Sequence, residues 1–262
     1  MDGTVHLQDL NKEVQDWVNS KSAEIEHLKK LEKYRRDFVG NVSHELKTPI
    51  FNVQGYVLTL LDGGLEDETI NRKYLLRTEK SIERLINIVT DLETIYKLES
   101  DKLVLKQERF DIVPVIRDAL ETLDSKAKKR GNTLKMNISP EKTVIVYADP
   151  GRISQVILNL VANSIAYGNE NGVTQIGFFD LDDNILIEVT DNGIGISETE
   201  IPRIFERFYR TDSSRSRKSG GTGIGLAIVK HILEAHNQTI NVRSELGEGS
   251  TFSFMLPKNQ KS

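Results

Sequence analysis

Seven consecutive residues at 43–49 (Ser-His-Glu-Leu-Lys-Thr-Pro) hold the densest group of reactive side chains in the sequence. If this segment is helical, His44 and Thr48 lie four residues apart on one face, with Glu45 beside them. The group combines a nucleophilic imidazole, a carboxylate that can take its proton and a hydroxyl that can orient water. An isolated His-Glu pair on a helix is more often a solvated surface, so the rest of the chain must decide between the two interpretations.

Two asparagines, Asn159 and Asn163, stand four residues apart in a segment at 151–166 that is predicted to be helical. They therefore share one face of that helix. Such amides suggest a ligand contact or a place in a magnesium shell that phosphates and water complete. Taken alone, helix caps and surface asparagines are commoner explanations.

Two glycine-rich segments follow further along the chain. Asp191 begins the segment 191–196, where a carboxylate at a strand end can accept a hydrogen bond from an exocyclic amine, and where Gly193 and Gly195 let backbone approach a flat ring. A tight turn explains that segment equally well. The second segment, 220–226, opens a predicted helix, and backbone amides at such a site bind phosphate.

Other nucleotide motifs are absent from the sequence. The glycine spacing does not fit the dinucleotide fingerprint, and neither a phosphate loop ending in Gly-Lys-Ser/Thr nor a His-Arg-Asp catalytic loop occurs. Between the glycine-rich segments, the polar stretch from Thr211 to Ser219 is predicted to be a mobile lid.

The elements that must position these groups begin with a long helix. Apolar residues at three-four spacing over 7–31 predict a short coiled coil whose register shifts near Lys21, with a lone amphipathic helix as the alternative. The pattern continues without a breaker to Leu60, so one helix should span both segments, with His44 facing water. Pro49 should kink this helix just after the reactive group.

Asp-Gly-Gly at 62–64 should end that helix, and three-four spacing over 82–96 predicts a second one. Two antiparallel helices with narrow apolar stripes make a poor core alone. Pairing two such hairpins in a four-helix bundle would bury both stripes, which predicts a homodimer.

After about residue 101 the pattern changes to short strands mixed with helices, which predicts an α/β sandwich with one sheet covered by helices on one face. Predicted strands lie at 103–105, 133–138, 143–147, 173–179, 185–190, 239–244 and 251–256. Predicted helices lie at 113–128, 151–166, 198–208 and 224–235. Hairpin turns are predicted at 183–184 and 247–249.

Composition limits the remaining possibilities. The 262 residues suit one large or two small domains, and a net charge of −4 gives no electrostatic argument for nucleic-acid or membrane-surface binding. The absence of cysteine excludes disulfides and thiolate metal sites. No apolar stretch approaches the roughly 18 residues that a membrane span needs, and no signal peptide is expected.

Taken in order, these segments resemble the sensor histidine kinases of bacterial two-component systems, over about residues 33–257. The resemblance comprises a phosphoacceptor box at 38–49, an asparagine box at 149–167, glycine boxes at 191–196 and 221–226, and a phenylalanine box at 204–210. The ATP-binding half also resembles the fold shared with gyrase and mismatch-repair ATPases, which lack the hairpin that carries His44.

The resemblance implies three domains: a coiled-coil signalling linker at 1–32, a dimerisation and histidine phosphoacceptor domain at 33–100, and a catalytic ATP-binding domain of the gyrase/histidine-kinase type at 101–262. It also implies ATP-dependent autophosphorylation of His44, with Glu45 as general base. Transfer to an aspartate in the receiver domain of a response regulator would follow. Thr48 completes the motif associated with dephosphorylating that regulator.

The same resemblance assigns the ligand contacts. Asn159 would bind Mg²⁺, Asn163 and Tyr167 the phosphates of ATP, Asp191 the adenine amine, and Arg210 the transferring phosphoryl group. The other residues implied for the ATP site are Gly193, Gly195, Ile196, Gly221, Thr222, Gly223, Gly225 and Leu226.

The sequence departs from the family pattern at Ala166, where many members carry a basic residue. We expect weaker ATP affinity, with the missing phosphate contact supplied, if at all, by Arg217 or Lys218. The histidines outside the motifs are expected to be structural or surface residues: His6, His27, His231 and His236.

The expected partners are a second copy of the chain and a cognate response regulator, with no nucleic acid and with membrane contact only through an upstream segment. The chain would then be the cytoplasmic portion of an inner-membrane sensor. Two alternatives are a catalytically silent nucleotide-binding scaffold of the same fold and an ATP-driven clamp of the gyrase type.

Overall fold

The computed structural model describes residues 3–99, 104–138, 142–211 and 222–260. The chain divides into two compact units, residues 1–78 and 79–262, and each is described by itself. The division falls inside the second long helix.

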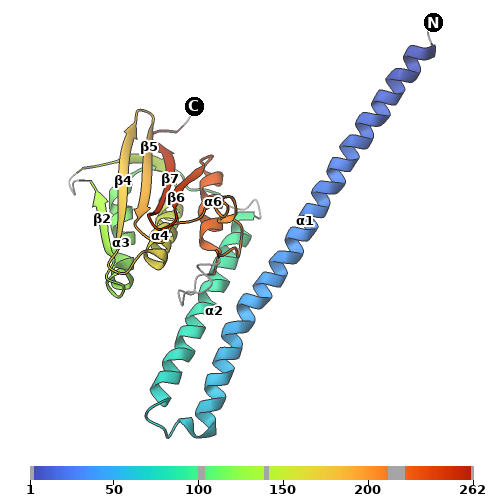
Figure 1. The fold of residues 1–262 in the computed structure, drawn as a ribbon. Helices are drawn as coiled ribbons and strands as arrows, with labels where there is room; N and C mark the ends of the chain where they lie inside the picture. Colours follow the sequence, from blue (N-terminus) through green and yellow to red (C-terminus); the bar gives the residue numbers. More distant parts are fainter. Residues whose placement is uncertain (1–2, 100–103, 139–141, 212–221, 261–262) are drawn as a thin grey trace. The chain divides into compact units, whose positions relative to one another are not determined.

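One helix, α1 (Gly3–Thr59), makes up most of the first unit, which confirms the prediction of a single long helix (Figure 1). It runs through Pro49 without an interruption, and that proline is buried. The predicted stop at 62–64 is also confirmed. There the chain leaves the α-helix through a π-type turn, η1 (Leu60–Gly64), in which Gly63 takes a φ of +90°, a conformation that glycine adopts without a steric penalty.

A short loop then leads into α2 (Asn71–Glu99), which confirms the second predicted helix. Asp67 holds the loop together, because its Oδ1 accepts hydrogen bonds from the backbone N–H and the hydroxyl of Thr69, at 2.8 and 2.6 Å. Within the first unit the rings of Tyr56 and Tyr74 lie 5.4 Å apart. The Arg77 guanidinium lies over both rings.

The second unit is built on a five-stranded sheet in the order β2-β4-β5-β7-β6 (Figure 1). β2 pairs with β4 in parallel, and the other neighbours are antiparallel. The bounds are β2 (Thr133–Asn137), β4 (Val173–Leu181), β5 (Asn184–Asp191), β6 (Ile240–Glu245) and β7 (Gly249–Pro257).

Within the described residues, the second layer contains three of the four predicted helices: α3 (Ile112–Lys128), α4 (Pro150–Tyr167) and α6 (Gly225–Ala235). α4 lies between the other two and contacts β4 and β5. Alternate residues of β5 are buried in this core, among them Ile187 and Val189. On the other side of the sheet, Phe179 and Met255 remain partly exposed.

The prediction of a single sheet was wrong. A separate two-stranded antiparallel sheet joins β1 (Glu108–Asp111) to β3 (Ile145–Ala148). The strand predicted at 103–105 was also wrong where it can be judged, since residues 104 and 105 form no strand. Pairing with β3 places the strand at the less apolar residues 108–111.

The helix predicted at 198–208 was wrong as well. Only one 3₁₀ turn, η2 (Ile201–Arg203), forms there. Further on, Phe208 takes a φ of +61° and donates its N–H to the carbonyl of Gly223, at 2.9 Å, so a tertiary contact replaces the helix. The turn after β6 lies where it was predicted, whereas the β4–β5 turn uses Asp182 and Asp183, one residue earlier than predicted.

Candidate functional site

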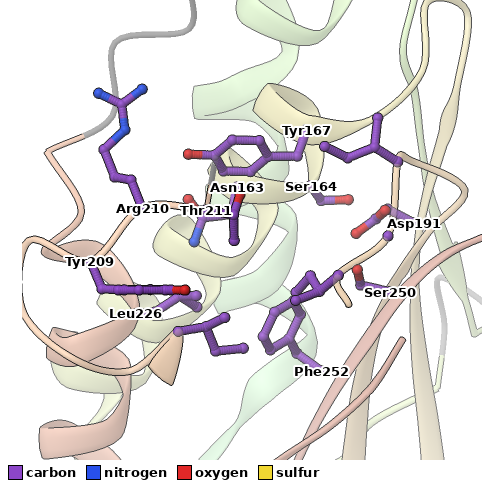
Figure 2. Close-up of a pocket in the computed structure, with 14 residues that line it drawn as sticks. Asn163, Ser164, Tyr167, Asp191, Tyr209, Arg210, Thr211, Leu226, Ser250 and Phe252 are labelled. Atoms are coloured by element: carbon purple, nitrogen blue, oxygen red, sulfur yellow. The ribbon is translucent and has the colours of Figure 1, made fainter. Parts of the chain in front are cut away.

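The second unit contains a pocket that is open to solvent, and the empty space in and at the mouth of this pocket is about 610 Å³. Figure 2 shows Asp191 and Ser250 on one side of it and Tyr209 and Arg210 on the other. α4, the end of β5, the loops after residues 191 and 203, the start of α6 and the start of β7 all contribute. The lining residues are Asn163, Ser164, Tyr167, Asp191, Ile194, Gly195, Ile196, Ile204, Tyr209, Arg210, Thr211, Leu226, Ser250 and Phe252.

Asp191 is the buried acidic group of this pocket, with 8% of its surface exposed at the end of β5. Its Oδ1 accepts the Gly193 N–H at 2.9 Å, and the carboxylate also accepts the backbone N–H of Ser250 and the hydroxyl of Ser164. Burial raises the pKa of Asp191, and these hydrogen bonds oppose that effect. The side chain is therefore a fixed hydrogen-bond acceptor facing a cavity.

Gly193 and Gly195 are needed because the backbone of neighbouring segments leaves no room for a Cβ at either position. A Cβ on Gly195, whose φ is +68°, would lie 1.9 Å from the Glu245 carbonyl oxygen. A Cβ on Gly193 would lie 2.5 Å from the Tyr167 carbonyl oxygen. Gly195 also lines the pocket, but Gly193 does not.

Of the two asparagines on α4, only Asn163 lines the pocket. Asp149 caps this helix by accepting the Arg152 N–H at 3.1 Å, and one face of the helix then carries Asn163 and Tyr167 into the pocket. Asn159 lies one turn earlier and does not line the pocket. Its amide faces the start of α6, since a Cβ on Gly225 would lie 3.5 Å from Asn159 Oδ1.

The second glycine-rich segment leads into α6, as predicted. Leu226 lines the pocket, whereas Thr222, Gly223 and Gly225 do not. Gly223 has a φ of +72°, and a Cβ there would overlap the Phe208 backbone. Gly221, Arg217, Lys218 and the predicted lid beyond Thr211 lie outside the described residues.

Thr222 makes a contact that the sequence did not predict. Its Oγ1 donates to Asp91 Oδ2 of α2 at 2.8 Å and accepts the Ile224 N–H at 3.3 Å. Burial raises the pKa of Asp91, and the Thr222 hydrogen bond lowers it. Ile95, one turn further along α2, is buried in the core of the same unit.

An arginine side chain, Arg130, lies against the backbone at Ala166. Arg130 Nη1 donates to the Ile165 carbonyl at 2.9 Å and also contacts the carbonyl of Ala166. A cation at the C-terminal end of a helix satisfies carbonyls that have no partner within the helix. Arg130 does not line the pocket, and its contacts stabilise the C-terminal end of α4.

Sequence reasoning missed several lining residues: Ser164, Ile194, Ile204, Tyr209, Thr211, Ser250 and Phe252. Ser250 reaches the site because it is the register partner of Asp191 on the neighbouring strand. No local pattern reveals such a pairing, whereas Ser164 could have been noticed beside Asn163 on α4.

The reactive group of the first unit lies on α1. His44 and Thr48 are exposed, and Glu45 is half-buried. Thr48 Oγ1 donates to the His44 backbone carbonyl at 3.3 Å. The exposure predicted for His44 is therefore confirmed.

Known protein families match both units. Residues 148–260 match the family described as histidine kinase-, DNA gyrase B-, and HSP90-like ATPase, and residues 34–101 match the His Kinase A (phospho-acceptor) domain. Fold and pocket thus define an ATPase-type nucleotide-binding unit joined to a phosphoacceptor helix pair. The chain belongs to the sensor histidine kinases of bacterial two-component systems.

Individual relatives agree with this family. The chain is 35% identical over 236 residues to the sensor protein kinase WalK of Staphylococcus aureus, which covers 89% of this chain and 56% of that protein. Matches to WalK from other strains cover 38% of those proteins, so the chain spans about half or less of these relatives. Within the described residues, no helix is both long enough and apolar enough to cross a membrane.

Two solved structures are similar as well. The histidine kinase AdeS of Acinetobacter baumannii is 28% identical, with a TM-score of 0.66, covering 83% of this chain and 98% of that one. The histidine kinase ThkA, in a complex with the response regulator protein TrrA, is 25% identical, with a TM-score of 0.69, covering 85% of this chain and 61% of that one.

Proposed function

We propose that this chain phosphorylates itself on His44 with ATP and passes the phosphoryl group to an aspartate of a response regulator. The observation that carries the proposal is the buried Asp191 carboxylate facing a pocket, in a chain that also exposes His44 beside Glu45. The ATPase family match supports the use of ATP.

In this proposal ATP lies in the pocket with its adenine amine donating to Asp191. Ile196 and Leu226 supply apolar walls, and Asn163 and Tyr167 on α4 lie towards the phosphates. Gly193, Gly195 and Gly223 allow the close backbone packing that shapes the site.

A divalent cation fits the amide of Asn159 better than it fits a carboxylate cluster. Within the described part of the chain, no group of three or more His, Cys, Asp or Glu side chains could hold a metal ion. Mg²⁺ commonly takes one or two protein oxygens and completes its shell with phosphates and water. We therefore assign Asn159 to Mg²⁺, which would neutralise phosphate charge.

For the chemical step, a neutral ring nitrogen of His44 attacks the γ-phosphorus. The bond from that phosphorus to the β,γ-bridging oxygen breaks and ADP leaves, while Glu45 takes the proton from the other ring nitrogen. Arg210 stabilises the charge on the transferring group. The phosphohistidine then gives its phosphoryl group to a receiver aspartate, and Thr48 assists later hydrolysis of the aspartyl phosphate.

A response regulator partner is supported by the ThkA complex with TrrA. A homodimer is supported by large apolar side chains left exposed along α1, such as Trp17 (63%), Phe51 (62%) and, just beyond that helix, Leu61 (70%). We further propose that the chain is the cytoplasmic part of a sensor whose membrane contact comes from an upstream segment.

Incubation with γ-labelled ATP tests the central step. The wild type should gain an acid-labile, base-stable label that is absent in His44→Gln, although His44→Gln should still bind ATP. The matched control is Thr48→Ala, which should keep the label but slow dephosphorylation of the regulator. Label that persists in His44→Gln would contradict the assignment.

A further inference from the structure

Behind Asp191 lies a row of buried polar side chains that join two strands, a loop and a helix. Asn132, Ser164, Thr174 and Asp191 are 6%, 3%, 0% and 8% exposed, in a core that is mostly apolar. Buried polar groups are costly unless they are hydrogen-bonded, so such a row requires a specific arrangement. Figure 2 shows Ser164 and Asp191 on the same side of the pocket.

Sheet register brings the row together. Thr174 of β4 is the direct partner of Asp191 on β5, so both side chains project from the same face towards α4. Ser164 on α4 lies over this pair: its Oγ is 2.8 Å from Thr174 Oγ1, and its hydroxyl donates to Asp191. At the far end, Thr174 Oγ1 lies 3.2 Å from Asn132 Oδ1.

The proton count of the two hydroxyls sets the direction of the row. If Thr174 gives its single proton to Asn132 Oδ1, its oxygen can only accept from Ser164, and Ser164 then has no proton left for Asp191. Among the described residues, Asn132 Nδ2 is buried with no hydrogen-bond partner. A half-turn of this amide brings Nδ2 to Thr174, and leaves an oxygen unpaired instead of an N–H, the less costly of the two.

We propose that Asn132, Thr174 and Ser164 form a one-way hydrogen-bond relay that fixes Asp191 as the acceptor for the amino group of adenine. Protons point along the row from the Asn132 amide to Thr174, from Thr174 to Ser164, and from Ser164 to the carboxylate. The relay rests on the proposed function, since it acts through the nucleotide contact of Asp191. These three are positioning residues, because their effect on the nucleotide passes through Asp191.

The relay makes the pocket selective. With the Gly193 N–H, the Ser250 N–H and the Ser164 hydroxyl already donating to it, the carboxylate keeps little freedom to rotate. An amino group donates to the remaining lone pair, whereas a purine without that group leaves a buried acceptor unpaired. Loosening the carboxylate should therefore weaken binding of ATP selectively.

The test compares two substitutions at one site in the full chain. Thr174→Val keeps the side-chain shape but removes the hydroxyl, and Thr174→Ser keeps the hydroxyl. The probes are ATP and purine riboside triphosphate, which lacks the amino group, and their dissociation constants are measured by calorimetry. We expect Thr174→Val to weaken ATP binding about tenfold and the analogue less than about twofold, and Thr174→Ser to retain the preference for ATP.

Each other outcome has a defined meaning. If Thr174→Val weakens the binding of ATP and of the analogue equally, the substitution has loosened the whole pocket and the relay is overturned. A variant that keeps the wild-type preference for ATP over the analogue also overturns it. Ser164→Ala gives a second test: it should lose the same preference, and the Ser164→Ala/Thr174→Val double variant should lose little more. A wild type that fails to bind ATP contradicts the proposed function itself, and the relay with it.

Discussion

The His44 segment and the pocket around Asp191 place polar chemistry in opposite surroundings. On α1, His44 and Thr48 are exposed, and the Thr48 hydroxyl donates its hydrogen bond to the backbone carbonyl of His44, not to the imidazole. Around Asp191, buried hydroxyls, backbone amides and glycines without room for a Cβ surround the carboxylate. In the proposed function His44 must meet two partners and therefore gains from accessibility, whereas the proposed recognition of adenine by Asp191 needs fixed geometry.

The largest effect should come from adding one carbon beside the pocket. Gly195→Ala places a Cβ 1.9 Å from the Glu245 carbonyl oxygen at a φ of +68°. We expect a loss of about 3 kcal/mol or more in the stability of the second unit. Hydrogen exchange of the β5 and β7 amides measures it, because the single tryptophan, Trp17, lies in α1 and does not report on that unit.

Gly247→Ala is the matched control for Gly195. Its φ is +87°, but nothing lies within 4 Å of the added carbon. It should cost only the backbone strain, about 1 to 2 kcal/mol. Equal losses at Gly195 and Gly247 would show that the close backbone packing at Gly195 is unimportant.

Asp191→Asn should weaken ATP binding about 100-fold, because an amide replaces a charged acceptor and turns an N–H towards buried donors. Calorimetry measures the affinity, and His44→Gln, in the other region, should change it less than about twofold. A similar loss in both variants would remove the contrast between the two sites.

Acid should weaken the second unit through His236. This side chain is 5% exposed; its Nε2 accepts the Asp149 N–H at 3.0 Å, and its Nδ1 lies 2.8 Å from the Ile232 carbonyl. Burial lowers the pKa of His236 below its ordinary value near 6.5. The unfolded chain then binds more protons as the pH falls below that value, so this contribution to stability is present above it and lost on acidification.

Urea unfolding at pH 7.5 and pH 5.5 measures this effect. The wild type should lose more stability between the two values than His236→Gln does. Asp91 and Asp191, whose pKa values are raised, act in the opposite direction and are common to both proteins. An equal change in the two proteins would exclude His236 as the cause.

The smallest effect should be a gain. Gly40 lies inside α1 with nothing within 4 Å of an added Cβ. Gly40→Ala should stabilise the helix by about 0.5 to 1 kcal/mol, because alanine loses less backbone entropy. Circular dichroism during thermal unfolding measures the shift, and a destabilised variant would show that position 40 carries a constraint.

The sequence was informative where order is local. Three-four spacing predicted both long helices, the helical stretches that became α3, α4 and α6 were also predicted, and Asp191 was correctly placed at a strand end. Prediction from the sequence failed where a contact between residues far apart in the chain determines the structure. Phe208 belongs to a helical pattern but bonds to Gly223, and Ser250 reaches the pocket only through its register with Asp191. The reason given for the glycines was also incomplete, since Gly193 first makes room for the Tyr167 carbonyl.

The continuity of α1 has a mechanical consequence for His44. A helix of 57 residues is about 85 Å long. The proline within it, Pro49, comes after His44, so no proline interrupts the segment from Gly3 to His44. A torque applied near the start of this rod would turn the imidazole through nearly the same angle. The proline lies beyond His44, so His44 turns together with the part of the helix that begins at Gly3.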